Sequence, residues 1–284
     1  MAILSIQSHV AFGHVGNRAA VFPLERIGCE VWPMHTVQFS NHTGYDTWTG
    51  EIFTAGHLAL VWSGLKARGC AAQCEAVLSG YLGSVEVGHF IMQTVDEIKA
   101  VHPEALYCCD PVMGDYGKGL FVDGGISTFI SGHAIHAADI VTPNQFEAEE
   151  ISGSVIASID DAKRACDTIH GMGPSIVLIT SFKPSDRSTT EISLFMSSHE
   201  GFRMLTTPEL TFDPPLHGSG DLASALFLGH YLVDRDPVDA LELMGDSVYA
   251  VFERTLADAA SELSLVHAQE EIAHPQRRFE ARRV

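Results

Sequence analysis

Gly218, Ser219, Gly220 and Asp221 stand directly before an apolar run that begins at Leu222, and we call these four residues the anion loop. Two glycines let a backbone turn tightly and approach a ligand closely. The first turn of a following helix would point unpaired N–H groups at an anion. An aspartate repels phosphate, but it can accept the proton of a hydroxyl while the loop holds the phosphoryl group in transfer. The anion loop therefore indicates phosphoryl transfer to an alcohol, although a capped helix start would show the same residue types.

Polar residues also end several of the expected strands. In an open parallel sheet, ligands bind beyond the carboxyl ends of the strands, so these residues are expected to share one site with the anion loop. They are Ser8, Asp110, Thr142, Pro143, Asn144, Thr180 and Ser181. One such residue would mean little, whereas the whole set favours a kinase.

The elements that must position these residues alternate between short β-rich runs and longer helical stretches. Strands are expected at residues 3–7, 30–37, 76–80, 105–110, 139–142, 176–180, 192–196 and 202–205, and helices at 17–27, 57–67, 85–100, 145–151 and 160–172. This alternation implies βαβ units and a mostly parallel sheet with helices on both faces. We expect one domain over residues 1–284, helical nearly to its end after the anion loop. The polar segment from Lys183 to Thr190 is either a mobile flap or an ordinary surface loop.

Composition excludes several classes of protein. A 46% hydrophobic and 19% charged chain of 284 residues fits a folded core, and a net charge of −19 argues against nucleic-acid or membrane-surface binding. No apolar run is long enough to span a bilayer. An ATP site in so acidic a chain would rely on glycine-rich backbone, helix N-termini and a bound cation. Without a signal-peptide pattern, the six cysteines are expected to be reduced thiols in the cytoplasm.

Several segments resemble the pyridoxal kinase branch of the ribokinase superfamily, in the family's order from about residue 3 to residue 230. The most specific is Val-Gln-Phe-Ser-Asn-His-Thr at residues 37–43, whereas the Gly-x-Gly-Asp pattern of the anion loop is shared across ribokinase-like enzymes. The others lie at residues 5–10, 13–20, 110–115, 142–147 and 179–181. The resemblance implies a three-layer α/β/α ribokinase-like fold and a homodimer. It also implies transfer of the ATP γ-phosphate to the 5′-hydroxyl of pyridoxal, pyridoxamine or pyridoxine, which would yield pyridoxal 5′-phosphate in vitamin B6 salvage.

The resemblance also implies roles at the nucleotide end. Asp221 would be the general base, and the N–H groups of the anion loop would hold the transferring phosphoryl oxygens. The expected Mg²⁺ residues are Asp110, Asp115 and Glu147, because Mg²⁺ takes one or two carboxylates with water and phosphate oxygens. A monovalent cation such as K⁺ is a further candidate cofactor. The expected ATP contacts are Asp110, Thr142, Asn144, Glu147, Thr180, Ser181, Phe212, Gly218, Ser219 and Gly220. The structural alternatives are a turn at Asp110 and helix capping by Glu147.

At the vitamin end, the resemblance points to Ser8 and Thr43 as the polar contacts, with Asp221 at the reacting hydroxyl. A pyridine nitrogen and a phenolic oxygen need a few well-placed partners in an otherwise apolar pocket. The expected walls are Val15, Val37, Phe39 and Tyr81, for which core packing is the alternative. His42 would steer the aldehyde or phenolic oxygen, unless its ring is satisfied by a backbone carbonyl.

Three other functions compete with this hypothesis. A ribokinase-like kinase for hydroxymethylpyrimidine or a sugar is disfavoured by the segment Asn41-His42-Thr43. A non-catalytic carrier of B6 vitamers is disfavoured by the complete anion loop. A dinucleotide-dependent reductase would need a third glycine after Gly13 and Gly16. Lys183, as an exposed loop lysine, is not expected to reach the nucleotide.

Overall fold

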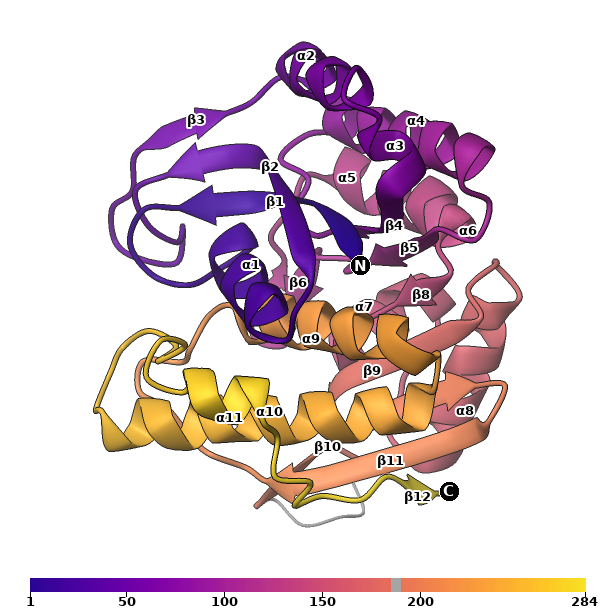
Figure 1. The fold of residues 1–284 in the computed structure, drawn as a ribbon. Helices are drawn as coiled ribbons and strands as arrows, with labels where there is room; N and C mark the ends of the chain where they lie inside the picture. The colour runs from indigo at the N-terminus through magenta and orange to yellow at the C-terminus, as the bar shows by residue number, and fades with distance from the viewer. Residues whose placement is uncertain (185–189) are drawn as a thin grey trace.

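The computed structural model describes residues 1–184 and 190–284, and a ten-stranded sheet forms the centre of this described part (Figure 1). In chain order its strands are β1 (Ala2–Val10), β2 (Glu30–Phe39), β3 (Gly50–Ile52), β4 (Cys74–Ser79), β5 (Leu106–Cys109), β8 (Ile140–Val141), β9 (Ile176–Phe182), β10 (Glu191–Ser198), β11 (Gly201–Pro208) and β12 (Arg282–Arg283). The order across the sheet is β12-β11-β10-β9-β8-β5-β4-β1-β2-β3. The six strands from β9 to β2 are parallel, and the pairs at both edges are antiparallel. The predicted mostly parallel sheet is therefore confirmed.

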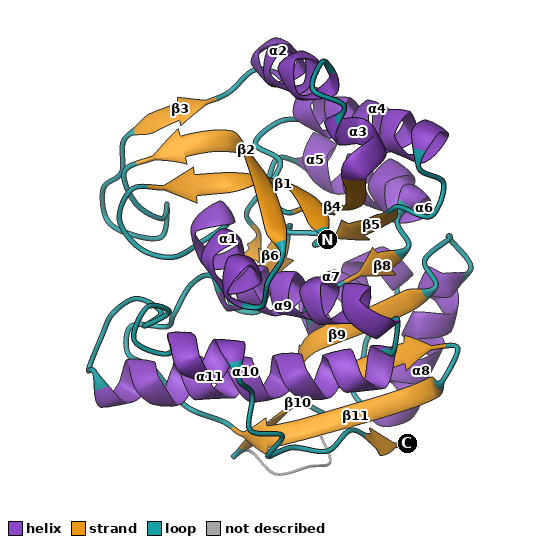
Figure 2. Ribbon diagram, in the orientation of Figure 1, coloured by secondary structure: helices purple, strands orange, loops and turns teal. Residues whose placement is uncertain are grey.

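Helices cover both faces of the sheet, as Figure 2 shows. One face carries α2 (Ala55–Lys66), α3 (Cys70–Gln73), α4 (Val85–Val101), α5 (Gly124–Phe129), a π-helical turn (Ile130–Ala134), α6 (Ile135–Ala137), α7 (Gln145–Ser152) and α8 (Ile159–His170). The other carries α1 (Asn17–Arg26), α9 (Ser219–Asp234), α10 (Pro237–Ala257) and α11 (Gln269–Ala273). Successive strand residues point to opposite faces, so Leu178 packs in one core and Ile179 in the other. The expected α/β/α layers follow from this alternation.

The C-terminal region differs from the prediction of a nearly continuous helix. After α10 the chain forms only the short α11 and then runs extended to β12, where Arg283 pairs with Arg203 of β11. Pro275 explains the end of α11, because the residue before a proline is pushed out of the helical region, and His274 has extended-side dihedral angles of φ −136° and ψ 70°. The last residues thus extend the sheet.

Two connecting segments also bear on the predictions. The predicted hairpin near Gly201 is confirmed by the antiparallel pairing of β10 with β11. The flap predicted from Lys183 to Thr190 falls largely on residues 185–189, which lie outside the described residues. A second hairpin, β6 (Gly114–Asp115) with β7 (Gly119–Leu120), was not predicted.

Within the described residues, no helix combines the length and apolarity that crossing a bilayer requires. The six cysteines are buried free thiols.

Candidate active site

A cavity of about 500 Å³ opens where the parallel strands end. Its walls contain residues that lie in or directly after six neighbouring strands. They are Ser8 and Val10 in β1, Phe39 in β2, Tyr81 after β4, Asp110 after β5, Thr142 after β8, and Thr180 and Ser181 in β9. The topology thus brings together the polar strand-end residues that the sequence singled out.

The anion loop forms another wall of the cavity and starts α9. Gly218 has φ 84°, and a Cβ atom there would lie 1.8 Å from the carbonyl oxygen of His14, so only glycine fits. No side chain caps α9, whose first turn contains Ser219, Gly220 and Asp221. The N–H groups of this turn have no intrahelical acceptor, so they could donate hydrogen bonds to an anion in the cavity.

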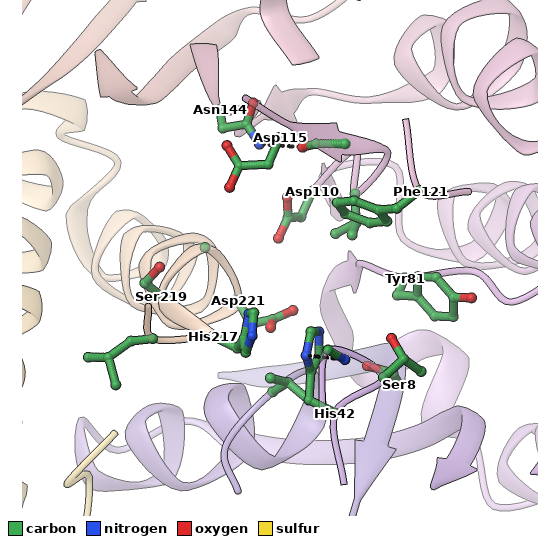
Figure 3. Close-up of a pocket in the computed structure, with 18 of the residues that line it drawn as sticks. Ser8, His42, Tyr81, Asp110, Asp115, Phe121, Asn144, His217, Ser219 and Asp221 are labelled. Carbon is green, nitrogen blue, oxygen red and sulfur yellow. Dashed lines mark hydrogen bonds between the residues drawn. The ribbon is translucent and has the colours of Figure 1, made fainter. Parts of the chain in front are cut away.

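Asp221 and Asp110 face the same space between the two ends of the cavity (Figure 3). Burial raises the pKa of Asp221, although the nearby Gly16 N–H group lowers it. Burial, followed by the negative charges of Glu147 and Asp221, raises the pKa of Asp110 well above its usual value. Buried carboxylates that repel one another in this way suit a bound cation.

Glu147 uses both carboxylate oxygens to hold backbone. Its Oε1 accepts from the N–H groups of Met113 (2.9 Å) and Gly114 (3.4 Å), and its Oε2 accepts from that of Asn144 (2.9 Å). Burial raises the pKa of Glu147 to about 7 in spite of these hydrogen bonds. The predicted capping role is therefore present, and Glu147 orders the loop beside Asp115.

Asn144 completes this arrangement at the start of α7. Its Oδ1 accepts from the Glu147 N–H group at 2.9 Å, and its Nδ2 donates to the carbonyl of Gly114 at 2.8 Å. Asp115 also lines the cavity, and its Oδ1 accepts from the N–H group of Tyr116 at 2.7 Å. In the described part of the chain, no three His, Cys, Asp or Glu side chains lie close enough to hold a metal by themselves. This donor set fits Mg²⁺, which keeps water and phosphate oxygens among its ligands.

At the opposite end, His42 presents a defined ring to the cavity. Its ring stacks on that of His217 with centroids 3.8 Å apart, and its Nδ1 accepts from the N–H group of Gly44 at 3.0 Å. Burial, the neighbouring His217 and Lys118 lower the pKa of His42 to about 4. A neutral ring that accepts at Nδ1 carries its proton on Nε2. The partner of His42 is therefore an amide N–H group and not the carbonyl considered from the sequence.

The structure brings most of the predicted vitamin-end residues together and excludes one. Ser8, Val15, Phe39, Thr43 and Tyr81 line the cavity. Val37 does not, because it is fully buried beneath them and packs in their hydrophobic cluster.

Phe212 likewise is not among the residues that line the cavity, and its ring packs edge-on against Phe252 of α10 with centroids 5.7 Å apart. Lys183 does not line the cavity either, and its Nζ lies 2.5 Å from Oε1 of Glu209. Of these two residues, only Phe212 was assigned to the nucleotide, and that assignment stays a prediction that the cavity lining does not support.

Several lining residues were not assigned from the sequence, and two of them, His217 and Lys118, have titratable side chains. His217 directly precedes the anion loop, and this adjacency was the signal that could have found it. Lys118 lies between Gly117 and Gly119 in the turn of the unpredicted β6–β7 hairpin, so its place over the cavity depended on an element that periodicity did not reveal. Lys118 supplies a positive charge at a site otherwise dominated by carboxylates.

The layers and strand order place the protein among the ribokinase-like α/β kinases. A family profile described as phosphomethylpyrimidine kinase matches residues 58–258. Pyridoxal kinase PdxY of Rubrobacter xylanophilus is 48% identical over 99% of this chain and 97% of that relative, and PdxY of Deinococcus radiodurans is 46% identical over 99% and 96%. The chain therefore belongs to the phosphomethylpyrimidine kinase family and, within it, to the pyridoxal kinases. The solved pyridoxal kinase from Leishmania donovani in complex with ADP and pyridoxine matches with a TM-score of 0.90 and 27% identity, covering 99% of this chain and 98% of that chain.

Proposed function

We propose that this protein transfers the γ-phosphate of ATP to the 5′-hydroxyl of pyridoxal, and of pyridoxamine and pyridoxine, as part of vitamin B6 salvage. One observation carries the proposal. Asp221 stands in a single cavity between the uncapped start of α9 and the polar end formed by Ser8, His42 and Thr43. A nucleotide phosphate and a small aromatic alcohol could therefore meet at this carboxylate. Full-length relatives named pyridoxal kinase support the same substrate class.

Asp221 would act as the general base. A primary alcohol is a weak nucleophile, and a carboxylate within hydrogen-bond reach can take its proton as the new P–O bond forms. The N–H groups of the anion loop would bind the transferring phosphoryl oxygens, and Thr142, Thr180 and Ser181 would contact the phosphates. Ser181 has φ 52°, a left-handed conformation that a serine adopts at a cost and that often marks a functional site.

A divalent cation fits beside Asp110, and we propose Mg²⁺. Asp110 and Asp115 would hold it together with nucleotide phosphates, while Glu147 would order the surrounding loop. When bound, Mg²⁺ neutralises the charge that builds on the phosphates during transfer. We also propose K⁺ as a monovalent cation near Ser219, where a hydroxyl and backbone carbonyls are the expected oxygen ligands.

The vitamin ring would lie against Phe39, Val15 and Tyr81, with Ser8 and Thr43 as hydrogen-bonding partners. The Nε2–H group of His42 would donate to the phenolic or aldehyde oxygen, because Gly44 already occupies Nδ1.

We further propose that the whole chain is a single kinase domain that works in the cytoplasm as a homodimer. Six buried free thiols support a reducing compartment. Exposed Ile52, Leu60 and Val61 on β3 and α2 support a surface that a second copy covers.

A substrate panel tests the proposed function. The protein is incubated with ATP, Mg²⁺ and pyridoxal, pyridoxamine, pyridoxine, hydroxymethylpyrimidine or ribose, and ADP release and the phosphorylated product are measured. We expect turnover with the B6 vitamers. The family profile named for phosphomethylpyrimidine makes hydroxymethylpyrimidine the second candidate substrate. Turnover of hydroxymethylpyrimidine alone would reject the vitamer proposal, and binding of pyridoxal without ADP release would indicate a carrier.

A further inference from the structure

Glu262 joins two loops of the candidate site from a distant part of the chain. It lies in the turn between α10 and α11, where the sequence shows no kinase motif. Its Oε2 accepts from the N–H group of His14 at 3.1 Å, and its Oε1 accepts from the hydroxyl of Tyr45 at 2.5 Å. His14 belongs to the loop after β1, and Tyr45 belongs to the loop between β2 and β3. Figure 1 shows the turn after α10 on the same side of the molecule as the ends of β1 and β2.

The loop after β1 is also the part of the chain that contacts the proposed base. The Gly16 N–H group lies near enough to the Asp221 carboxylate to lower its pKa, and the His14 carbonyl lies against Gly218. Gly13 packs so closely on Glu262 that a Cβ atom there would lie 2.5 Å from Oε2. One short segment therefore meets Glu262 at one end and the anion loop at the other.

The loop between β2 and β3 contains His42 and Thr43, two of the three polar residues proposed for the vitamin end. Tyr45 donates its N–H group to the carbonyl of His42 at 3.2 Å, and the neighbouring Gly44 N–H group holds the His42 ring. The Tyr45 ring also packs edge-on against Phe12 of the first loop, with centroids 6.2 Å apart. Glu262 thus fixes Tyr45 at a point where the two loops already touch.

The chemistry of Glu262 argues against a simple surface ion pair. Across residues 1–184 and 190–284, no lysine or arginine forms a salt bridge with it, and its described partners are a backbone amide and a tyrosine hydroxyl. A carboxylate that accepts two hydrogen bonds from separate loops restrains the position of both.

We propose that Glu262 is a positioning residue. It holds the loop between β2 and β3 and the segment 13–16 in fixed positions relative to Asp221. The inference rests on the proposed function for its kinetic consequences, whereas the coupling of the two loops is independent of it. Glu262 would not touch the substrates, and its effect would pass through His14, Gly16 and Tyr45.

Four variants test the proposal: Glu262→Ala, Glu262→Gln, Tyr45→Phe and the control Glu271→Ala, which removes a half-buried carboxylate paired with Arg254. We expect Glu262→Ala to raise the pyridoxal KM by about tenfold and to lower kcat severalfold, because small displacements of reacting groups are costly, while the ATP KM stays within about twofold. Glu262→Gln should stay within about threefold of the native protein, since its amide can accept from the His14 N–H group and donate to the Tyr45 oxygen. Adding Tyr45→Phe to Glu262→Ala should have little further effect.

Amide hydrogen exchange of the ligand-free protein separates this inference from the proposed function. In Glu262→Ala, exchange should accelerate in residues 11–16 and 41–49 and stay unchanged in the distant β10–β11 hairpin. Acceleration confined to the turn that contains Glu262 would overturn the proposal, whether or not pyridoxal is a substrate. Equal increases in both KM values with a lower Tm, or failure of glutamine to rescue, would also overturn it. If the native protein phosphorylates no B6 vitamer, the proposed function fails and the exchange pattern alone decides the coupling.

Discussion

Replacing Asp221 with asparagine isolates the proton-accepting role proposed for this residue. The amide has almost the shape of the carboxylate, and its Oδ1 offers an acceptor to the nearby Gly16 N–H group. General base catalysis contributes about 10²- to 10⁴-fold in rate, or about 2.7–5.4 kcal/mol of activation free energy. We therefore expect kcat with pyridoxal to fall by about that factor, while the Kd of an ATP analogue changes by less than about threefold.

The same substitution should stabilise the ligand-free protein. Burial raises the pKa of Asp221, so the folded state binds the proton more tightly than the unfolded state does, and each tenfold difference in proton affinity corresponds to about 1.4 kcal/mol. The resulting destabilisation is present at pH values above the pKa of Asp221 in the folded state. It disappears as the pH falls below the pKa of Asp221 in the unfolded state. Asparagine carries no charge, and the Tm of the variant at neutral pH in EDTA should exceed that of the native protein.

Steady-state kinetics, calorimetric titration of an ATP analogue and thermal unfolding measure these three effects. Asp167→Asn, the same change at an exposed position of α8, is the matched control and should leave all three unaltered. A decrease in kcat of less than tenfold would refute the role of Asp221 as general base. Parallel loss of nucleotide binding, or a lower Tm, would show that its carboxylate is structural.

Three further predictions concern the vitamin end, the anion loop and acid stability. Thr43→Ala should raise the pyridoxal KM about fivefold through the loss of roughly 1 kcal/mol of hydrogen bonding, and leave the ATP KM unchanged in steady-state assays. Gly218→Ala should lower the free energy of unfolding by clearly more than Gly28→Ala. Both glycines have positive φ, but only at Gly218 would a Cβ atom clash, 1.8 Å from the His14 carbonyl oxygen. Equal losses of unfolding free energy in denaturant titrations would contradict this. Burial lowers the pKa of His230 to about 4, so the unfolded state takes up a proton first as the pH falls below 6.5, and stability should drop between pH 6.5 and 4. Partial exposure reduces this loss below about 1.4 kcal/mol per pH unit, and His230→Gln should show a shallower acid slope.

Sequence alone predicted the parts of the site that local chemistry defines. Gly218 and Asp221 were found because a tight turn and a helix start impose residue types over a few positions. The strand-end residues Asp110 and Thr142 were found because parallel strands end at one edge. These features need only the chain direction and the two-residue period of a strand.

The rest depended on tertiary packing. Val37 and Phe39 lie two residues apart in β2 and pack in the same hydrophobic cluster, so packing against adjacent strands decides which of them lines the cavity. Phe212 follows the course of an irregular loop that no periodicity describes. Glu262 belongs to no sequence motif. A single glutamate after a long helix becomes informative only when the structure shows its hydrogen bonds to His14 and Tyr45.

The contact between His14 and Gly218 joins positions that lie about two hundred residues apart in the chain. A nascent polypeptide that has emerged only as far as β11 would already contain Ser8, His42 and Thr43, the residues proposed to bind the vitamin. It would still lack the start of α9 and the Asp221 carboxylate, which are proposed to bind phosphate and to accept the proton. Contacts between residues so far apart in the chain are slow to form. Premature termination before α9 would release a fragment unable to hydrolyse or transfer phosphate at this site. Competence for ATP consumption is thus deferred until the final quarter of translation.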